Sequence, residues 1–403
     1  MIWSKTDRIS EKQDDSFGIV FINLGSLLAQ IVQIAGFPTL LALALSRFGY
    51  PSWVIGAILA SQWLVVLLLA PFVPKLMTRF GVRLAAQLGS ALSVVAVLLL
   101  LIPNSAIVSG LSAIMMGAGL TVRWVVCDTW IVQSVHEKAR GRAIGIHETL
   151  MGLGLAVGPF ITMLSNGNET AAVAIYSAIL IASIVCFFRG SIVPEGDIDE
   201  ASGISGQIKQ VFWILPLALL AALAAGYVET SMVSLMPLYL LNFEYPETNA
   251  LTLLSIFGLG GTILQAPLGW IADRWSFRAA QLLCVALIII GGTSIITLIN
   301  LPWAIAVILF VWGGCVGGLN TLAVIEAGST LRPELSGTGM AMIASSYTLG
   351  GVIGPVVSGA TLSHGNGHGP IIVIVGLMVA YSLTLTLSRR KRFCEPPQSA
   401  APL

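Results

Sequence analysis

Charged residues are scarce in this chain of 403 residues: Asp, Glu, Lys and Arg together make up 10% of it, whereas a soluble domain carries roughly 25%. The formal net charge is only +1, which gives no basis for binding a nucleic acid. Apolar residues make up 56% of the chain, and the mean hydropathy is +0.91. This composition excludes an ordinary soluble domain and places the chain in a lipid bilayer.

Sequence signatures of pumps and soluble catalysts are also absent. No Gly-Lys-Ser/Thr phosphate loop occurs, so nothing indicates transport driven by ATP. The five cysteines have neither metal-site spacing nor the pattern of a disulfide framework. No catalytic triad or metal cluster is evident. We therefore predict a protein that is not an enzyme and that binds no cofactor or metal.

What the sequence does contain is a series of long apolar segments. Twelve of them reach the roughly 17 residues needed to cross the hydrocarbon core of a membrane. They lie near residues 17–45, 52–77, 84–102, 105–134, 143–165, 170–188, 209–241, 249–272, 279–299, 302–330, 338–362 and 370–388. Backbone groups find no water in lipid, so these segments are predicted to be helices. The ten-residue alternation of a membrane barrel is missing.

Basic residues orient the predicted helices. If the N-terminus is cytoplasmic, 18 of the 20 Lys and Arg residues fall on the cytoplasmic side, leaving Arg47 outside and Arg123 within a helix. The polar segment 1–16 lacks the apolar core of a signal peptide, so no cleavage is expected. The longest polar connection divides the chain in two. The predicted parts are a cytoplasmic segment 1–16, a six-helix half 17–190, a cytoplasmic linker 191–208, a second six-helix half 209–388 and a basic cytoplasmic tail 389–403.

The two halves repeat each other. Eighteen residues separate Gly141 from Pro159, and the same interval separates Gly337 from Pro355. A basic turn follows an apolar run in both halves, at 78–83 and again at 269–278. A duplicated membrane unit is the architecture of a two-halved transporter.

These turns resemble the Gly-x-x-x-Asp-Arg-x-Gly-x-Arg motif of the major facilitator superfamily. The second copy fits at Gly269, Asp273, Arg274 and Arg278, and the first keeps Arg79, Gly81 and Arg83 but has Thr78 in place of Asp. Residues 128–131 and 265–270 are similar to the bacterial YcaD-like branch of that family. The resemblance implies an all-α membrane protein with twelve transmembrane helices in two six-helix bundles. It also implies a monomeric secondary transporter in the bacterial cytoplasmic (inner) membrane, with both termini cytoplasmic.

The basic turns are predicted to close the cytoplasmic mouth. Arginines at the membrane surface can bind helix C-terminal carbonyls or acidic groups of the opposite half. The alternative is that they only anchor the topology. The residues assigned to this gate are Arg79, Gly81, Arg83, Asp128, Arg142, Gly269, Asp273, Arg274 and Arg278.

Ionisable residues at membrane depth are few and mark candidate functional sites. Spans four and five run antiparallel through the turn near residue 138, so Asp128 is expected level with His147 and Glu148. Arg123 then lies about 7.5 Å deeper, at 1.5 Å per residue. In the alternative interpretation, Asp128 is a structural lock paired with Arg83 or Arg142, and His147 packs structurally. Glu326 is close enough to the membrane surface to extend its carboxylate there.

Glu229 is the interior carboxylate of the first helix of the second half. The repeat interval of 196 places it opposite Gln33. The alternative is an interhelical hydrogen bond without substrate contact. Among the tryptophans and tyrosines, Trp63, Trp124, Trp130 and Tyr347 can face a cavity, and Trp124 is the one assigned to it. The residues assigned to substrate binding or coupling are Gln30, Gln33, Arg123, Trp124, Glu148, Tyr227 and Glu229.

These features predict a secondary active transporter that moves a small organic solute by alternating access and uses proton coupling. The mixture of amides, charges and aromatic residues favours an amphipathic or heteroaromatic substrate. The alternatives are a passive facilitator and a transport-inactive membrane sensor or scaffold with the same fold. No partner other than the substrate, protons and the lipid bilayer is expected.

Overall fold

The structure, a computed structural model, describes residues 5–102, 105–135, 137–190, 204–274 and 276–387. These residues form helices and the short connections between them. The first half contains α1 (Lys5–Gln30), η1 (Ile31–Gly36), α2 (Phe37–Arg47), α3 (Ser52–Leu69), η2 (Ala70–Phe72), α4 (Val73–Leu99), α5 (Ala106–Ser134), α6 (Glu137–Leu164) and α7 (Glu169–Phe188). The second contains α8 (Ile204–Ile214), α9 (Pro216–Asn242), α10 (Glu247–Arg274), α11 (Phe277–Leu298), α12 (Pro302–Thr330), α13 (Pro333–Thr361), η3 (Gly365–Gly367) and α14 (Gly369–Leu387).

Ten stretches of the described chain are long and apolar enough to cross a membrane. One of them, Ser52–Leu99, has 48 residues, which is enough for two spans. Gly81, with φ 74°, breaks it at the turn predicted between the second and third spans. Dividing the stretch at Gly81 and counting α10 gives the twelve helices predicted from the sequence. The seventh begins later than predicted, at Pro216, because the chain leaves the helical conformation at Leu215 after α8.

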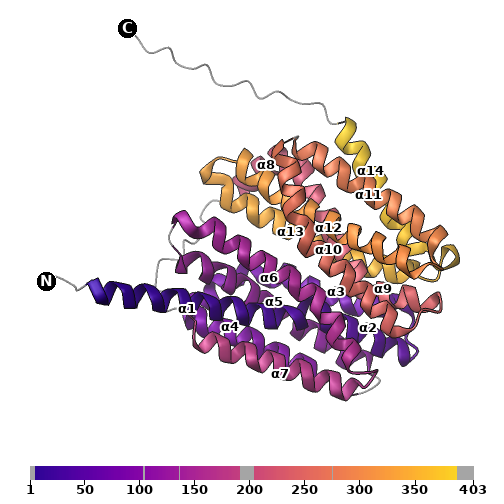
Figure 1. The fold of residues 1–403 in the computed structure, drawn as a ribbon, viewed down its shortest axis with the longest axis horizontal. Coiled ribbons are helices and arrows are strands. Elements are labelled where there is room, and N and C mark those ends of the chain that lie inside the picture. The colour runs from indigo at the N-terminus through magenta and orange to yellow at the C-terminus, as the bar shows by residue number, and fades with distance from the viewer. Residues whose placement is uncertain (1–4, 103–104, 136, 191–203, 275, 388–403) are drawn as a thin grey trace, which may run out of the picture.

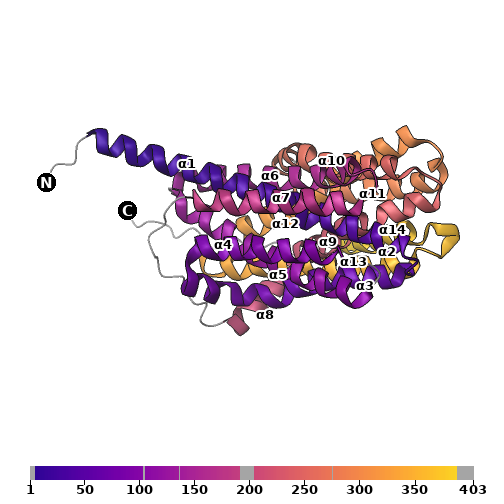
Figure 2. The same cartoon turned by 90° about the horizontal axis from the view of Figure 1, so that it is seen from below.

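The helices form two bundles that lie side by side, α1–α7 in one and α8–α14 in the other (Figure 1). α1 begins at one end of the molecule, and α8 lies toward the same end in both views (Figure 1, Figure 2). We call this the terminal end, and the opposite end, where α2 finishes at Arg47, the Arg47 end.

Glycines set how closely the helices approach within each half. A side chain at Gly158 of α6 would lie 2.6 Å from the carbonyl oxygen of Ile31 in η1. Its repeat counterpart, Gly354 of α13, lies in the same way against the backbone of Tyr227 in α9. The Gly-Pro segments shared by the two halves therefore pack α6, the fifth span, on the first span, and α13, the eleventh span, on α9, the seventh. A larger residue would force these helices apart.

Contacts between the halves begin at the Arg47 end. There α3 packs on α13, where Gly56 contacts Pro355. On the other side of the interface α6 packs on α10, where Gly152 contacts Thr262. Closer to the terminal end the facing surface of α6 becomes exposed, and the position of a side chain at Gly145 has no neighbour within 4 Å. The halves therefore meet tightly at the Arg47 end and separate toward the terminal end.

Candidate functional site

Arg123 lies at the centre of a hydrogen-bond network in the first half. This residue of α5 is fully buried. Its Nε donates to Gln33 Oε1 at 2.9 Å, and one terminal nitrogen donates to Gln30 Oε1 at 2.6 Å. The other terminal nitrogen lies 3.6 Å from the sulfur of Met151 on α6. Three residues that the sequence assigned to the site, Gln30, Gln33 and Arg123, are therefore in direct contact.

The π-helix η1 fixes the orientation of Gln33. A π-helical turn leaves the regular hydrogen-bond pattern, so its backbone carbonyls can accept bonds from side chains. Gln62 of α3 donates to the carbonyl oxygen of Gln33 at 2.8 Å. The Gln33 amide nitrogen donates to Ser93 Oγ at 2.7 Å. Gln33 therefore bonds within its own half, and the cavity beside Glu229 is lined by the adjacent Ile34 instead. Gln62 and Ser93 were missed, although each is an uncharged polar residue within an apolar segment.

Asp128 and His147 form a second polar group near Arg123. His147 is buried, and its Nδ1 donates to Asn23 Oδ1 at 2.9 Å. Its Nε2 lies 3.2 Å from Asp128 Oδ1. The contact is an ion pair only when the His147 ring carries both of its protons. Arg83, a predicted alternative partner of Asp128, instead donates to the carbonyl oxygen of Gly190 at 2.8 Å.

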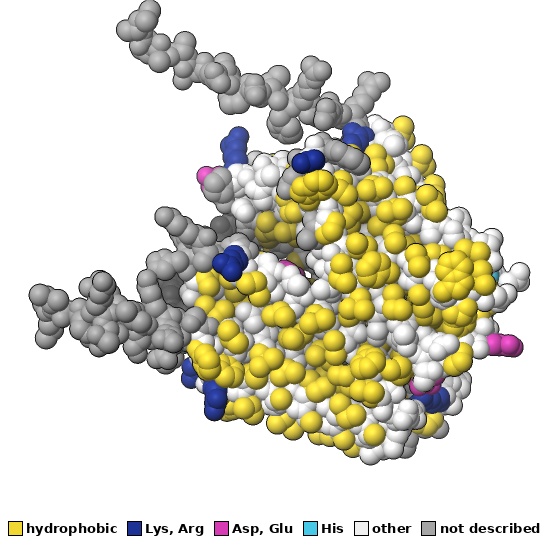
Figure 3. All heavy atoms as spheres, viewed as in Figure 1, with side chains coloured by type: hydrophobic (Ala, Val, Ile, Leu, Met, Phe, Trp, Pro, Cys, Tyr) yellow, Lys and Arg dark blue, Asp and Glu magenta, His cyan; other side chains and the backbone are white. Residues whose placement is uncertain are grey.

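Glu148 is exposed and lies where the two halves separate. It is on α6, one helical turn from the contact between Gly152 and Thr262. Its carboxylate interacts electrostatically with Arg123 and Asp128 of its own half, and with Tyr347 of the other. Figure 3 shows the surface hollowed between the two halves, with acidic side-chain atoms inside the hollow. Glu148 is an exposed carboxylate on the stretch of α6 where the halves separate.

Glu229 faces the first half across the interface. It lines a small cavity together with Ile34, Pro38, Trp63, Thr230, Val233 and Ser234. The hydroxyl of Tyr347, on α13, lies beside its carboxylate. Trp63 and Tyr347 pack edge to face with their ring centroids 5.9 Å apart. A carboxylate and two aromatic rings from both halves thus meet at one place.

Two predicted site residues, Tyr227 and Trp124, are not among the residues that line the Glu229 cavity. Tyr227 is buried against α13. Two positions along a helix correspond to about 200° of rotation, so Tyr227 and Glu229 point to different neighbours. Trp124 is half-buried and packs against the hydrophobic core. The aromatic residues at the site are Trp63 and Tyr347, which the sequence identified only as candidates of lower rank.

Two of the predicted gate arginines contact aromatic rings of their own halves. Arg79 lies 5.4 Å from the ring of Phe80, and Arg274 lies 4.5 Å from that of Trp270. Arg142 is exposed, Arg278 is half-buried in the first turn of α11, and Gly269 has open space around it. Asp273 belongs to α10, but its side chain is outside the described part of the structure. Among the described residues, no hydrogen bond or ion pair joins the halves at the terminal end, so closure there stays a prediction.

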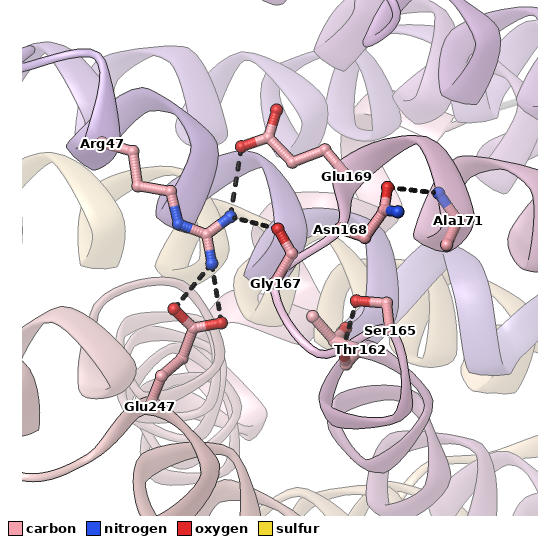
Figure 4. Close-up of polar contacts among 8 residues, drawn as sticks. All are labelled: Arg47, Thr162, Ser165, Gly167, Asn168, Glu169, Ala171 and Glu247. Atoms are coloured by element: carbon pink, nitrogen blue, oxygen red, sulfur yellow. Dashed lines mark hydrogen bonds and ion pairs between the residues drawn. The ribbon is translucent and has the colours of Figure 1, made fainter.

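Arg47 connects the two halves at the opposite end, as Figure 4 shows. One terminal nitrogen lies 3.2 Å from Glu169 Oε1 and donates to the carbonyl oxygen of Gly167. The other donates to both carboxylate oxygens of Glu247, at 2.8 and 2.6 Å. Glu169 begins α7 and Glu247 begins α10, so the guanidinium bridges the halves. In the sequence, Arg47 stood out only as a basic residue on the outer side. That exceptional position was the one indication in the sequence that Arg47 has a special role.

Replacing Arg47 with Gln should loosen the closed end. The ion pairs are partly exposed, so we expect a loss of about 1 kcal/mol and about a fivefold shift toward conformations open at that end. A cysteine at Ser234, which lines the Glu229 cavity, would report this in a background without the native cysteines. Its labelling by a membrane-impermeant maleimide in intact cells should accelerate severalfold.

Arg332→Gln provides the matched control, because Arg332 is an exposed arginine at the terminal end. It should leave labelling at Ser234 unchanged. Equal labelling rates in the Arg47→Gln variant and the parent protein would contradict a closing role for Arg47. Faster labelling confined to inverted vesicles would show that the Arg47 end faces the cytoplasm.

Comparisons with known proteins agree with this architecture. Residues 19–355 match the Major Facilitator Superfamily. An uncharacterized MFS-type transporter, YfkF of Bacillus subtilis, is 23% identical over 344 residues, covering 83% of this chain and 87% of the relative. An uncharacterized MFS-type transporter, YcaD of Escherichia fergusonii, is 22% identical over 380 residues, covering 92% and 96%. The crystal structure of the nucleoside transporter NupG superposes with a TM-score of 0.76 at 11% identity, covering 91% of this chain and 98% of that one, which supports the fold.

Proposed function

The chain belongs to the major facilitator superfamily, whose members are membrane transporters and not enzymes, and we propose that it is a monomeric secondary active transporter driven by protons. A multi-pass membrane setting and a small-molecule substrate follow from the family. Alternating access, proton coupling and the orientation of the chain are our proposals. The main observation in support is the shape of the interface between the halves, which is closed at the Arg47 end and open beyond Glu148.

Alternating access requires an interface that can open at either end. In this structure α3 packs on α13 and α6 packs on α10 near the Arg47 end. The Arg47 bridge depends on partly exposed ion pairs, which are weak enough to break. Rocking of the two rigid halves around the central polar residues would open this end and close the other. The basic turns with Arg79 and Arg274 are then placed to form the second closure.

Proton coupling requires groups that change protonation as access changes. Asp128 and His147 form a contact that is an ion pair only when the His147 ring is protonated, and Asp128 lies near Arg123. Glu148 and Glu229 are carboxylates at the interface of the halves, so rocking changes their surroundings. Ionisable groups at membrane depth are costly and mark proton or substrate pathways in transporters. A passive facilitator or a sensor would not need to retain them.

The distribution of basic residues supports an orientation with both termini in the cytoplasm. Lys75, Arg79, Arg142, Arg274 and Arg332 all lie toward the terminal end of the described structure. Basic residues concentrate on the cytoplasmic side of bacterial membrane proteins. The structure would then represent a state open to the cytoplasm and closed to the outside by Arg47.

Transport in liposomes tests the proposal. A deletion strain screened for nutrient dependence and toxicant sensitivity would first identify a transported compound. The purified protein should then concentrate that compound across a membrane bearing an imposed pH gradient without ATP, and a protonophore should abolish the accumulation. Movement that only equalises the two concentrations would make the protein a passive facilitator. A requirement for ATP would rule out secondary transport.

A further inference from the structure

The polar interior carries an unbalanced charge. Arg123 interacts with Asp128 and Glu148 across α5 and α6, and Glu229 adds a third carboxylate on α9. One guanidinium therefore stands against three carboxylates, with His147 contributing positive charge only when it is protonated. Unpaired charges are costly away from water. Among the described residues of this region, carboxylates thus outnumber cationic groups, which favours protons or a bound cation beside them.

The guanidinium of Arg123 is not available to an anionic ligand. The side chain has no exposed surface. Its Nε and its terminal nitrogens are directed at Gln33, Gln30 and the sulfur of Met151. An anion would have to displace these partners before it reached the charge. Arg123 therefore acts as a fixed internal counter-ion of the acidic residues.

Acidic and aromatic side chains lie at the interface instead, with Trp63 and Tyr347 buried in this state. Glu148 is exposed on the face of α6 directed at the second half. Tyr347 lies beside Glu229 and is close enough to Glu148 for an electrostatic interaction. Trp63 forms a wall of the Glu229 cavity and packs against Tyr347 at 5.9 Å. Aromatic faces bind cations and also accept flat apolar groups.

We propose that this site binds an organic monocation with an aromatic or other apolar body, between Glu148 and the pair formed by Trp63 and Tyr347, with Glu229 at the closed end. The inference rests on the proposed transport function, because it assigns a substrate class to the same site. It narrows the amphipathic solute predicted from the sequence to one of positive charge.

In this geometry, protons and the cation compete for the same two carboxylates. Both neutralise Glu148 and Glu229, whose titratable or charged neighbours are Arg123, Asp128, His147 and Tyr347. A cation that binds to these carboxylates displaces their protons, and protonation releases the cation. Exchange of protons for the cation across the membrane follows from this competition when the two halves alternate.

Equilibrium binding tests the inference without any gradient. Radiolabelled phenyltrimethylammonium, a small aromatic cation of fixed charge, would be titrated against the full-length protein in nanodiscs. We expect saturable binding that weakens as the pH falls. Benzenesulfonate, an aromatic anion of similar size, and tert-butylbenzene, the neutral isostere, should not compete. No saturable binding at millimolar concentrations, or equal competition by benzenesulfonate, would overturn the inference.

Matched variants locate the site. Glu148→Gln removes a charge at an exposed position and should weaken binding about tenfold. Trp63→Leu should weaken it about fivefold through loss of the aromatic face. Glu326→Gln is the control, because Glu326 is a half-buried carboxylate that bonds to Gln281 within the second half, away from the interface. Equal affinities of the Glu148→Gln and Glu326→Gln variants would exclude the proposed site.

Binding and transport can fail separately. Saturable cation binding in a protein that accumulates nothing under a pH gradient would support the inference and contradict the proposed coupling. Proton-driven transport of a neutral or anionic compound by a protein that does not bind phenyltrimethylammonium would support the function and overturn the inference.

Discussion

Glu229→Gln should abolish uphill, proton-driven transport, while the protein still inserts and folds. The substitution keeps the shape of the side chain and its ability to hydrogen-bond to Tyr347, but it removes the proton-binding group from the cavity at the interface. A proton that crosses about 100 mV supplies about 2.3 kcal/mol, enough for about fiftyfold accumulation of a substrate. The accumulation ratio of the variant in liposomes should fall to about one.

Two measurements separate coupling from general damage. Exchange between equal pools should persist in Glu229→Gln at saturating substrate, and its thermal unfolding should stay close to that of the parent protein. Glu326→Gln removes a carboxylate within the second half and should retain uphill transport. Undiminished accumulation by Glu229→Gln across a range of pH would reject its coupling role and assign coupling to Arg123, Asp128, His147 and Glu148.

Arg123→Met should produce the largest loss of stability among single substitutions in the first half. The change leaves the side-chain oxygens of Gln30 and Gln33 without their donor. It also removes the positive charge that faces Asp128 and Glu148. Breaking a buried network of this kind costs about 3–5 kcal/mol, so both folding and transport should fail. Unfolding of the detergent-solubilised protein, followed by tryptophan fluorescence, measures the loss.

Further variants test whether the network explains the effect. Arg123→Lys keeps the charge but not the forked pair of donors, so it should lie between Arg123→Met and the parent protein. Gln33→Met should lower stability less in the Arg123→Met variant than in the parent protein, because the two residues share one hydrogen bond. Arg142→Met, at an exposed position of α6, should change stability by less than about 0.5 kcal/mol. An unfolding midpoint of Arg123→Met equal to that of Arg142→Met would contradict the structural role of Arg123.

The proximity of Arg123, Asp128, His147 and Glu148 could be predicted because it depends on local geometry. All four lie on two helices joined by a short turn, so helical rise and the position of the turn fix their relative depth. The partners of Arg123 could not be assigned in the same way. Gln30 and Gln33 come from α1 and η1, and η1 departs from the α-helical repeat on which a sequence prediction of side-chain direction depends.

The membrane class, the two repeated halves and the break at Gly81 could be predicted from the amino-acid sequence. Its long apolar runs, the interval from Gly141 to Pro159 repeated from Gly337 to Pro355, and the basic turns were sufficient for that. These features depend on transfer into lipid and on close backbone packing, and both are visible in composition and spacing.

The polar residues that meet across the interface could be identified only in the folded protein. Helices that are apolar on all sides carry no periodic pattern that distinguishes the side facing the other half. The sequence therefore gave no reason to rank Trp63 and Tyr347 above Trp124. It also gave no reason to expect a hydrogen bond between Gln33 and Arg123. The Arg47 bridge depends on Glu169 and Glu247, which are 78 residues apart in the sequence. Such contacts arise from the docking of the two halves, which no local pattern records.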